Sequence, residues 1–575
     1  MDNRNVADIL EDVARMLELE GEDAFRIRAY RKASESVASL NGDINEYHRE
    51  GRLREIPGVG KSIGELIVEL LETGTSPYYE SLKKETPPEL FDIINVPGIG
   101  SKTAVKIHRT LGVTTPEEFS EAAKSHRIRN IKGFGDKAEK KILDSIVRFR
   151  SVEAETRIHI FRALGVVAEL RSYLQGCDGT DRLEVVGSVR RRAEMVADIN
   201  LLVVSANPKA AIDCFCNSPV SYATKKSTGH SAQVDTRYRV GATMECVASE
   251  DLGLHMVFDT GSGAHVNQLV ELAGARGIRL SHEGYVDAVT LKESHFATEE
   301  ALYGALGLDY VPPELREGRG EVEAAAQHEL PDLVQTKDIA GDLHVHSEWS
   351  DGSATIQDMA VAAQAKGYEY LAICDHSQSL RIANGLSIER LRDQMAEIDR
   401  INDSLEHFTL LKGSEVDIQP DGTLDLPDEV LAELDIVVAS VHTSLRQEPK
   451  VITQRVLRAL ENEHVTILAH PTSRIIGRRA PMLVDMDTVI ASVIEHNKVL
   501  ELNSYPDRLD MNDEHVRKAM DAGAMISIDT DAHSASELDF MDFGVSVARR
   551  GWAIKGRVLN TMPYTELLSF LGGGL

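Results

Sequence analysis

The chain of 575 residues has few cysteines and few aromatic residues, and it contains no long apolar run. Its five cysteines are odd in number and form no CxxC pair, so the sequence predicts reduced thiols and a cytoplasmic protein. No apolar stretch approaches the length that crosses a bilayer, and the acidic, amphipathic start MDNRNVADILEDVARML differs from a signal peptide. We therefore expect no membrane partner.

Positive charge is scarce over the whole chain, whose formal net charge is −29. Taken alone, that charge disfavours a polyanion as a partner. The distribution is uneven, however, because residues 101–150 hold twelve Lys or Arg against six Asp or Glu. The length allows about three to five domains. We therefore expect a basic domain within an otherwise acidic chain.

Nine side chains of metal-ligand type are spread over roughly the last 235 residues, each at the end of a strand-like run or in a loop. They are His344, His346, Asp351, His376, Glu415, His442, His470, Asp531 and His533. Imidazoles and carboxylates without a thiolate suit Zn²⁺ or Mn²⁺ and disfavour a structural zinc cage. Nine ligands exceed the needs of one tetrahedral ion. We therefore expect two or three ions, and clusters of that kind hydrolyse phosphoesters.

The surroundings of these side chains are typical of a β/α barrel. Strand-like runs such as YLAIC and LDIVVASV alternate with helix-like segments such as ATIQDMAVAAQAKG. The order H-x-H, D, H, E, H, H, D-x-H closely resembles the PHP (polymerase and histidinol phosphatase) phosphoesterases over residues 340–575. The resemblance implies a distorted (β/α)₇ barrel around a trinuclear metal centre.

The resemblance also distributes the ligands among the ions. It implies one ion on His344, His346, Glu415 and Asp531, a second on Glu415, His442 and His470, and a third on Asp351, His376 and His533. Glu415, His442 and Asp531 are expected to be catalytic through the ions that they hold. Arg474, four residues past His470, is a candidate to grip a phosphate, and a plain surface role is the alternative.

Three glycine turns recur near the N-terminus, each between helix-like segments: PGVGK (57–61), PGIGSK (97–102) and KGFGDK (132–137). Bare backbone N–H groups at a helix start can approach a phosphate closely, and a lysine follows each turn. The turns resemble helix-hairpin-helix motifs, which bind the DNA backbone without sequence preference. The expected DNA contacts are Gly58, Gly60, Lys61, Gly98, Gly100, Lys102, Gly133, Gly135 and Lys137. A protein–protein contact by one of the three turns remains an alternative.

The middle of the chain resembles a nucleotidyl transferase. Asp198 and Asp235 lie on two strand-like runs that we expect to be adjacent, and acids on adjacent strands would hold two Mg²⁺ ions against a triphosphate. The candidates to cradle its phosphates are Gly187, Ser188, Arg191 and Arg157. Together with FRIRAYRKASESV (25–37) and FDTGSGAHVNQLVELAGARGIRL (258–280), these features resemble family X DNA polymerases from residue 1 to about 315. Fusion to a PHP barrel resembles the bacterial and archaeal PolX architecture.

Four positions depart from the family X pattern. Asn200 stands where the second acid of Asp-x-Asp is expected, and a neutral amide weakens a site for a hard cation. Asp259 replaces an aromatic residue beside the incoming sugar, and Val266 replaces an asparagine that would bond a base edge. Leu66 occupies the position of a Schiff-base lysine, and leucine cannot form an imine. We therefore expect an impaired polymerase and no lyase activity.

Composition and motifs together predict a multidomain α/β protein with six segments. They are a helical lyase-like domain at 1–80, a helical fingers-like domain at 81–150, a palm at 151–225, a thumb at 226–315, an acidic linker at 316–339 and the PHP barrel at 340–575.

The expected function is that of a monomeric DNA repair protein on the nucleoid, which binds gapped, nicked or 3′-ended DNA. Its barrel would act as a metal-dependent 3′→5′ exonuclease or 3′-end phosphoesterase, beside a weakened palm. Alternatively, the palm is an active gap-filling polymerase that uses deoxynucleoside triphosphates, with Glu194 or Glu184 replacing the lost acid. The sequence also leaves open a phosphatase for a small phosphoester, of the histidinol-phosphatase type, and a non-catalytic DNA scaffold.

Overall fold

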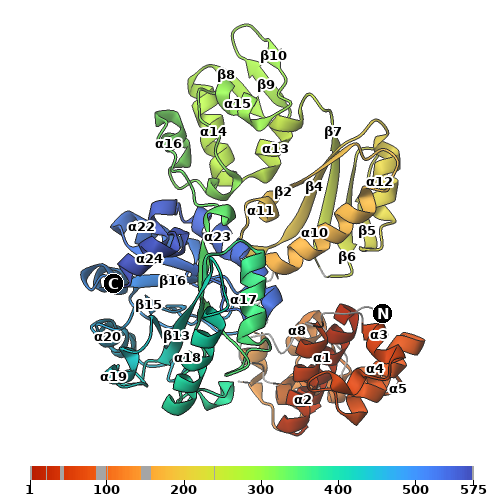
Figure 1. Ribbon diagram of the computed structural model, residues 1–575. Helices are drawn as coiled ribbons and strands as arrows, with labels where there is room; N and C mark the ends of the chain where they lie inside the picture. Colours follow the sequence, from red (N-terminus) through yellow and green to blue (C-terminus); the bar gives the residue numbers. More distant parts are fainter. Residues whose placement is uncertain are drawn as a thin grey trace. The chain divides into compact units, whose positions relative to one another are not determined.

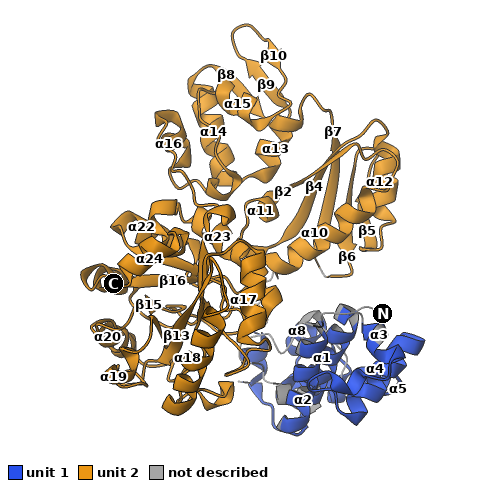
Figure 2. Cartoon of the chain, in the orientation of Figure 1, with its two compact units in different colours: residues 1–155 blue, residues 156–575 orange. Residues whose placement is uncertain are grey.

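The computed structural model forms two compact units, residues 1–155 and 156–575 (Figure 2). It describes residues 3–20, 22–38, 40, 44–85, 99, 101–114, 116–136, 138–143, 157–238 and 240–572. Within those residues, no helix is both long enough and apolar enough to cross a membrane.

The described part of the first unit is helical. Its helices are α1 (Asn3–Glu20), α2 (Ala24–Ala38), α3 (Ile44–Arg49), α4 (Lys61–Thr73), α5 (Pro77–Glu85), α7 (Ser101–Leu111) and α8 (Pro116–Lys124) (Figure 1). Apolar side chains recur every three or four residues along α1, so that Val6, Leu10, Val13 and Leu17 form one buried stripe. A second cluster gathers around Ile107 and Phe119. The described residues of this unit therefore form two small cores.

The second unit begins with a five-stranded sheet in the order β2-β4-β7-β6-β5. The strands are β2 (Arg182–Val186), β4 (Asp198–Val204), β5 (Ser221–Ser227), β6 (Ser231–Thr236) and β7 (Gly241–Val247), with a short pair of β1 (Ile158–His159) and β3 (Met195–Val196) beside them. Helices α10 (Ile160–Leu174), α11 (Gly187–Arg190) and α12 (Pro208–Cys216) belong to this part. The sheet extends beyond residue 225, the palm limit drawn from the sequence, because β6 and β7 hydrogen-bond into it.

A disulfide in this region contradicts the prediction that all the cysteines are reduced. Cys177, just after α10, is joined to Cys214 of α12. The two residues are 37 positions apart and share no motif, so only the packing of α10 against α12 brings them together. Cys216, Cys246 and Cys374 are free thiols.

Next come the thumb helices and a hairpin. Their bounds are α13 (Leu252–Thr260), α14 (Gly263–Ala275), β8 (Ile278–Ser281), β9 (Gly284–Asp287), β10 (Glu293–Ser294), α15 (Glu299–Ala305) and α16 (Glu321–Gln327). Arg316, at the start of the predicted linker, is fully buried and donates to Glu299 Oε1 at 2.7 Å. Glu321 is also buried, 2.8 Å from His265 Nδ1. The first part of the predicted linker therefore packs into the thumb.

The last part is a barrel of seven parallel strands, paired in chain order (Figure 1). The strands are β11 (Gly341–Val345), β12 (Tyr370–Ile373), β13 (Thr409–Asp417), β14 (Ile436–Ser440), β15 (Ile467–Leu468), β16 (Val499–Asn503) and β17 (Met525–Asp529). The helices are α17 (Ile356–Ala365), α18 (Ile388–Asn402), α19 (Asp428–Leu431), α20 (Pro449–Leu460), α21 (Met486–Glu495), α22 (Asp513–Ala522), α23 (Met541–Arg550) and α24 (Tyr564–Phe570).

Backbone contacts join the first strand of this barrel to the segment after the last. Val345 forms a parallel bridge with Ala532, whose carbonyl accepts from the His346 N–H at 2.8 Å. The Asp531 N–H in turn donates to the His344 carbonyl at 3.0 Å. The barrel is therefore nearly closed, and the predicted multidomain α/β fold is confirmed.

Candidate metal centre

All nine predicted ligands lie at or just beyond the carboxyl ends of the barrel strands. His344 is in β11 and Glu415 in β13, whereas the other seven follow strands β11, β12, β14, β15 and β17. In a parallel barrel these ends share one rim, so residues up to 189 positions apart in sequence converge there.

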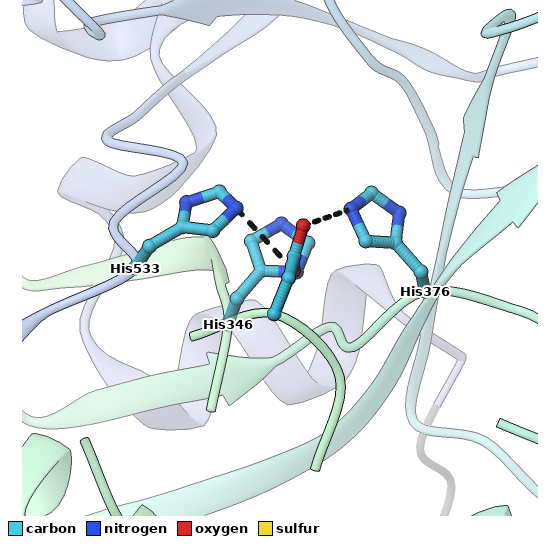
Figure 3. A group of neighbouring side chains, drawn as sticks. His346, His376 and His533 are labelled. Carbon is cyan, nitrogen blue, oxygen red and sulfur yellow. Dashed lines mark ion pairs between the residues drawn. The ribbon is translucent and has the colours of Figure 1, made fainter. Parts of the chain in front are cut away.

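Ligand atoms lie within 4.8 Å of one another in three overlapping groups at this rim. The groups are His344, His346 and Asp531; His376, Glu415 and His442; and His346, Asp351, His376 and His533. Figure 3 shows His376 and His533 on either side of His346, with a dashed line from each of the two to a carboxylate that lies between them. These lines mark the ion pairs that join His376 Nε2 and His533 Nε2 to the Asp351 carboxylate at 3.5 and 3.4 Å.

Glu415 is the centre of the cluster. Its carboxylate lies 3.0 Å from His470 Nε2, 3.3 Å from His442 Nε2 and 3.4 Å from His344 Nε2. His376 Nδ1 is also 2.9 Å from it, although the resemblance placed His376 with the third ion. A single carboxylate that touches four imidazoles is well placed to bridge two ions.

The charge of the Glu415 carboxylate and an unpaired imidazole nitrogen suit metal ions at this rim. Burial by itself would raise the pKa of the Glu415 carboxyl, but the charges of His376, His442 and His344 hold that pKa well below its usual value. Among the described residues, His346 Nδ1, which lies 3.8 Å from Asp351 Oδ1, is buried without a hydrogen-bond partner. Such orphaned nitrogens are costly unless something binds them. The donor set therefore fits more than one ion.

Backbone strain marks the same rim. His470 and Asp531 adopt φ values of 25° and 54°, which non-glycine residues rarely adopt. Strain of this kind costs about 1–3 kcal/mol per residue and persists where the surroundings impose it. It aims both side chains inward.

Two carboxylates behind the rim were not predicted from the sequence. Glu501 of β16 accepts from His344 Nδ1 at 2.5 Å and from the His470 N–H at 2.6 Å. Asp417 accepts from His442 Nδ1 at 3.0 Å. The two contacts to ring nitrogens leave Nε2 of His344 and Nε2 of His442 to face the cluster. Carboxylates behind metal-binding histidines orient the rings in this way. The available signal was an acid at a strand end, in VLELN and SEVDI.

Arg474, the predicted phosphate ligand, is engaged elsewhere. Its Nη2 lies 2.6 Å from Glu194 Oε2 in the palm, and its Nε donates to the Arg508 carbonyl at 2.9 Å. Arg508 does lie beside a predicted ligand, with Nε 3.5 Å from Asp531 Oδ2. Its Nη1 is buried without a partner in the described part of the chain. Arg508 therefore replaces Arg474 as the candidate to hold a phosphate.

The predicted palm acids lie on one face of the sheet. Asp198 of β4 and Asp235 of β6 are both in register with Gly241 of β7, which lies between them. A Cβ added at Gly241 would meet nothing within 4 Å, so an open space separates the acids. Asp235 pairs with Lys225 at 2.6 Å. Neither acid belongs to a close group of three ligands in the described structure.

The predicted phosphate turn lines a cavity of about 450 Å³, whose wall includes Arg157, Ser188, Arg191, Glu317, Arg319 and Arg550. Gly187 begins the turn with φ +70°, and the Asn200 amide packs against it. Arg191 Nε donates to Glu317 Oε1 at 3.1 Å, and Arg550 donates to the same carboxylate at 2.8 Å. The Glu317 carboxylate is thus paired with the Arg191 guanidinium, which we expected to bind a phosphate.

The glycine turns are described in part. Gly58 has φ +83°, and a Cβ there would lie 2.9 Å from the Ala33 nitrogen, so only glycine fits. Gly60 caps α4, which starts at Lys61 and buries Leu66. Gly133 has φ +94°, with Gly135 two residues later. Gly98, Gly100, Lys137 and the side chain of Lys102 lie outside the described residues.

Four family models match the chain. Residues 1–76 match a helix-hairpin-helix domain, 90–147 a SAM-like helix-hairpin-helix tandem, 255–317 the DNA polymerase beta thumb and 342–505 the PHP domain. Fold and site therefore define a PHP-domain protein that carries helix-hairpin-helix modules and a polymerase-type thumb.

Comparison with curated proteins narrows the class. The chain is 37% identical over 573 residues to the DNA polymerase/3′-5′ exonuclease PolX of Bacillus subtilis (strain 168), with 99% of each chain covered. A probable phosphatase of Thermoanaerobacter sp. (strain X514) is 28% identical over 38% of this chain and 89% of its own. One from Acetivibrio thermocellus is 31% identical over 35% of this chain and 82% of its own. The chain belongs to the bacterial PolX family.

Proposed function

We propose that this protein trims DNA 3′ ends at the barrel rim, as a metal-dependent 3′→5′ exonuclease or 3′-end phosphoesterase. The observation that carries the proposal is the convergence of nine histidines and acids on one rim, with His346 Nδ1 buried and unpaired among them. The named activity of the Bacillus subtilis relative, which is matched end to end, supports it.

The chain's own residues would divide the work. His344, His346, Asp351, His376, Glu415, His442, His470, Asp531 and His533 would hold two or three Zn²⁺ or Mn²⁺ ions. When bound, the ions supply an activated water and offset the charge of the phosphate. Glu501 fixes the orientation of His344 through Nδ1. The unpaired Nη1 of Arg508 would bind a phosphate oxygen of the substrate.

DNA would be held by the helix-hairpin-helix modules, whose family models cover most of residues 1–147. Gapped or nicked DNA would bind through its backbone and without sequence preference, by a monomer on the cytoplasmic nucleoid. The basic stretch at 101–150 provides the charge that the rest of the chain lacks.

Replacement of barrel ligands tests the proposal. In His344→Ala and His470→Ala, nuclease activity on a gapped duplex should fall at least about 100-fold, because both side chains face Glu415. Gapped-DNA affinity should stay within about twofold, because binding rests on the phosphate contacts. His464→Ala, which changes a barrel histidine outside the cluster, is the matched control. Full activity in both ligand variants would refute the assignment.

We further propose that the palm synthesises DNA poorly. Asn200 supplies no charge, Asp235 is paired with Lys225, and Glu317 occupies Arg191. Glu194 and Glu184, which could replace the missing acid, are also paired: Glu194 with Arg474 and Glu184 with Arg182. Efficient extension of a one-nucleotide gap with Mg²⁺ or Mn²⁺ would contradict this.

A small phosphoester is the second candidate substrate, because the probable phosphatases match over most of their own length but over only 38% and 35% of this chain. Turnover of p-nitrophenyl phosphate, compared with that of a 3′-ended oligonucleotide, separates the two. A kcat/KM that favours the oligonucleotide supports DNA as the substrate.

A further inference from the structure

A cluster of two histidines and an aspartate lies in the thumb, outside the barrel. His255 and Asp259 are one turn apart on α13 and share a face of that helix. His282 joins them from the turn between β8 and β9. The ligand atoms of the three side chains lie within 4.8 Å of one another, and the two imidazole rings are 4.6 Å apart.

The three side chains do not satisfy one another. His282 Nε2 lies 2.9 Å from Asp259 Oδ1, which is a hydrogen bond. His255 Nδ1 lies 3.8 Å from Asp259 Oδ2, which is too long for one. Both of these last atoms are buried and have no partner in the described structure. A donor and an acceptor that face each other unbonded indicate that something belongs between them.

The spacing suits a transition-metal ion. Nitrogen and oxygen ligands of tetrahedral Zn²⁺ stand about 2.0–2.2 Å from the ion, which places neighbouring ligand atoms about 3.3 Å apart. The observed 2.9 and 3.8 Å bracket that value. Two imidazoles disfavour Mg²⁺ and Ca²⁺, which prefer oxygen ligands.

We propose that His255, Asp259 and His282 bind one divalent transition-metal ion, with Zn²⁺ preferred. The fourth position faces solvent, because the His282 side chain is 43% exposed, against 18% for His255. The site is independent of the barrel rim and needs none of its residues.

The place of the cluster gives the ion a role. The cluster connects α13 to the β8–β9 hairpin, and its member Asp259 directly precedes Thr260. Thr260 meets the phosphate turn, since its hydroxyl accepts from Arg190 Nη1 at 2.7 Å and its carbonyl accepts from Arg191. An ion at Asp259 would therefore stiffen the junction of palm and thumb. It would also give Asp259 a function other than the one that family X polymerases assign to its position.

The simpler alternative is an ion pair without metal, between Asp259 and a protonated His282. The metal site and the ion pair differ in how much zinc the protein binds. The full-length protein would be stripped with a chelator, reloaded with Zn²⁺, desalted and measured by mass spectrometry for bound zinc. His255→Gln and Asp259→Asn should each lose one zinc per chain relative to the parent. His328→Gln changes an exposed histidine that pairs with Asp309 and belongs to no close group of three ligands in the described structure, and it should lose none.

A spectroscopic signature and a folding check complete the test. With Co²⁺ in place of Zn²⁺, the difference spectrum between parent and His255→Gln should show one tetrahedral Co²⁺. Nuclease activity of His255→Gln should stay unchanged. His282→Asn, at the most exposed position, serves if the other variants unfold. Equal zinc content in the parent and in folded variants would overturn the proposal and leave the ion pair.

Discussion

Arg474 of the barrel and Glu194 of the palm form an ion pair, with Nη2 2.6 Å from Oε2. Glu194 follows the turn that carries Ser188 and Arg191, whereas Arg474 follows His470. Arg474 also donates to the Arg508 carbonyl. The pair therefore connects the predicted nucleotide turn of the palm to the backbone of the arginine beside Asp531.

Removal of that pair should loosen palm from barrel. Glu194→Gln should lower the free energy of unfolding by about 1 kcal/mol, because Glu194 is 35% exposed and water screens part of the attraction. A double-mutant cycle with Arg474→Gln, followed by denaturant unfolding, measures the coupling. The exposed pair of Arg478 and Asp507, at 3.7 Å, is the control and should couple by less than about 0.5 kcal/mol. Equal coupling in both pairs would contradict the connection.

Glu501→Gln should weaken metal binding without changing DNA affinity. Glu501 is fully buried and accepts from both His344 and His470, so the amide would disturb two predicted ligands at once. Loss of a carboxylate behind metal-binding histidines typically costs about 10–100-fold in metal affinity. Competition with a fluorescent chelator measures the change. Glu495→Gln, at an exposed position on α21, should leave the affinity as it was.

Arg508→Ala should lower kcat/KM for 3′-end cleavage about 100-fold, since the guanidinium would hold a phosphate in the transition state. Arg508→Lys should recover only part of that loss, because a lysine offers a point charge and no planar fork. Zinc content should stay at the parent level in both variants. Arg478→Lys, at a side chain 67% exposed, is the control. Unchanged kcat/KM in Arg508→Ala would remove Arg508 from the site.

Asn200→Asp should increase gap filling at least about 10-fold with Mg²⁺, because the added carboxylate restores charge on the face that carries Asp198. Asn200→Ser is the control and should add nothing. Single-nucleotide extension of a gapped duplex measures both. If both variants match the parent, Asn200 does not limit synthesis.

The disulfide predicts a redox-dependent stability of the palm. It closes a loop with a sequence separation of 37, so its loss should lower the free energy of unfolding by about 3–4 kcal/mol in the chain-entropy account. Cys214→Ser should unfold at lower denaturant than the parent under oxidising conditions. A reductant should abolish that difference. Cys216→Ser, two residues away with a free thiol, should behave like the parent.

The barrel and the gathering of ligand-type side chains at its rim could be predicted from the sequence because both signals are local. A ligand-type residue at the end of an apolar run can be recognised without knowledge of the partner strands. The distribution of ligands over ions depends on distances between side chains from different strands, and the sequence does not give these distances. The structure shows His376 beside both Asp351 and Glu415. Pairs such as Arg474 with Glu194 and Cys177 with Cys214 follow from packing between distant elements, which no spacing reveals.

Closure of the barrel also sets the order in which the parts of the chain can fold during translation. The strand that carries His344 meets the segment of Asp531 only at the far end of the domain, 187 residues later in the sequence. A growing chain therefore completes its helix-hairpin-helix modules long before it can assemble the rim. A truncation between residues 147 and 533 therefore leaves a product that keeps the N-terminal modules and lacks a complete set of rim ligands.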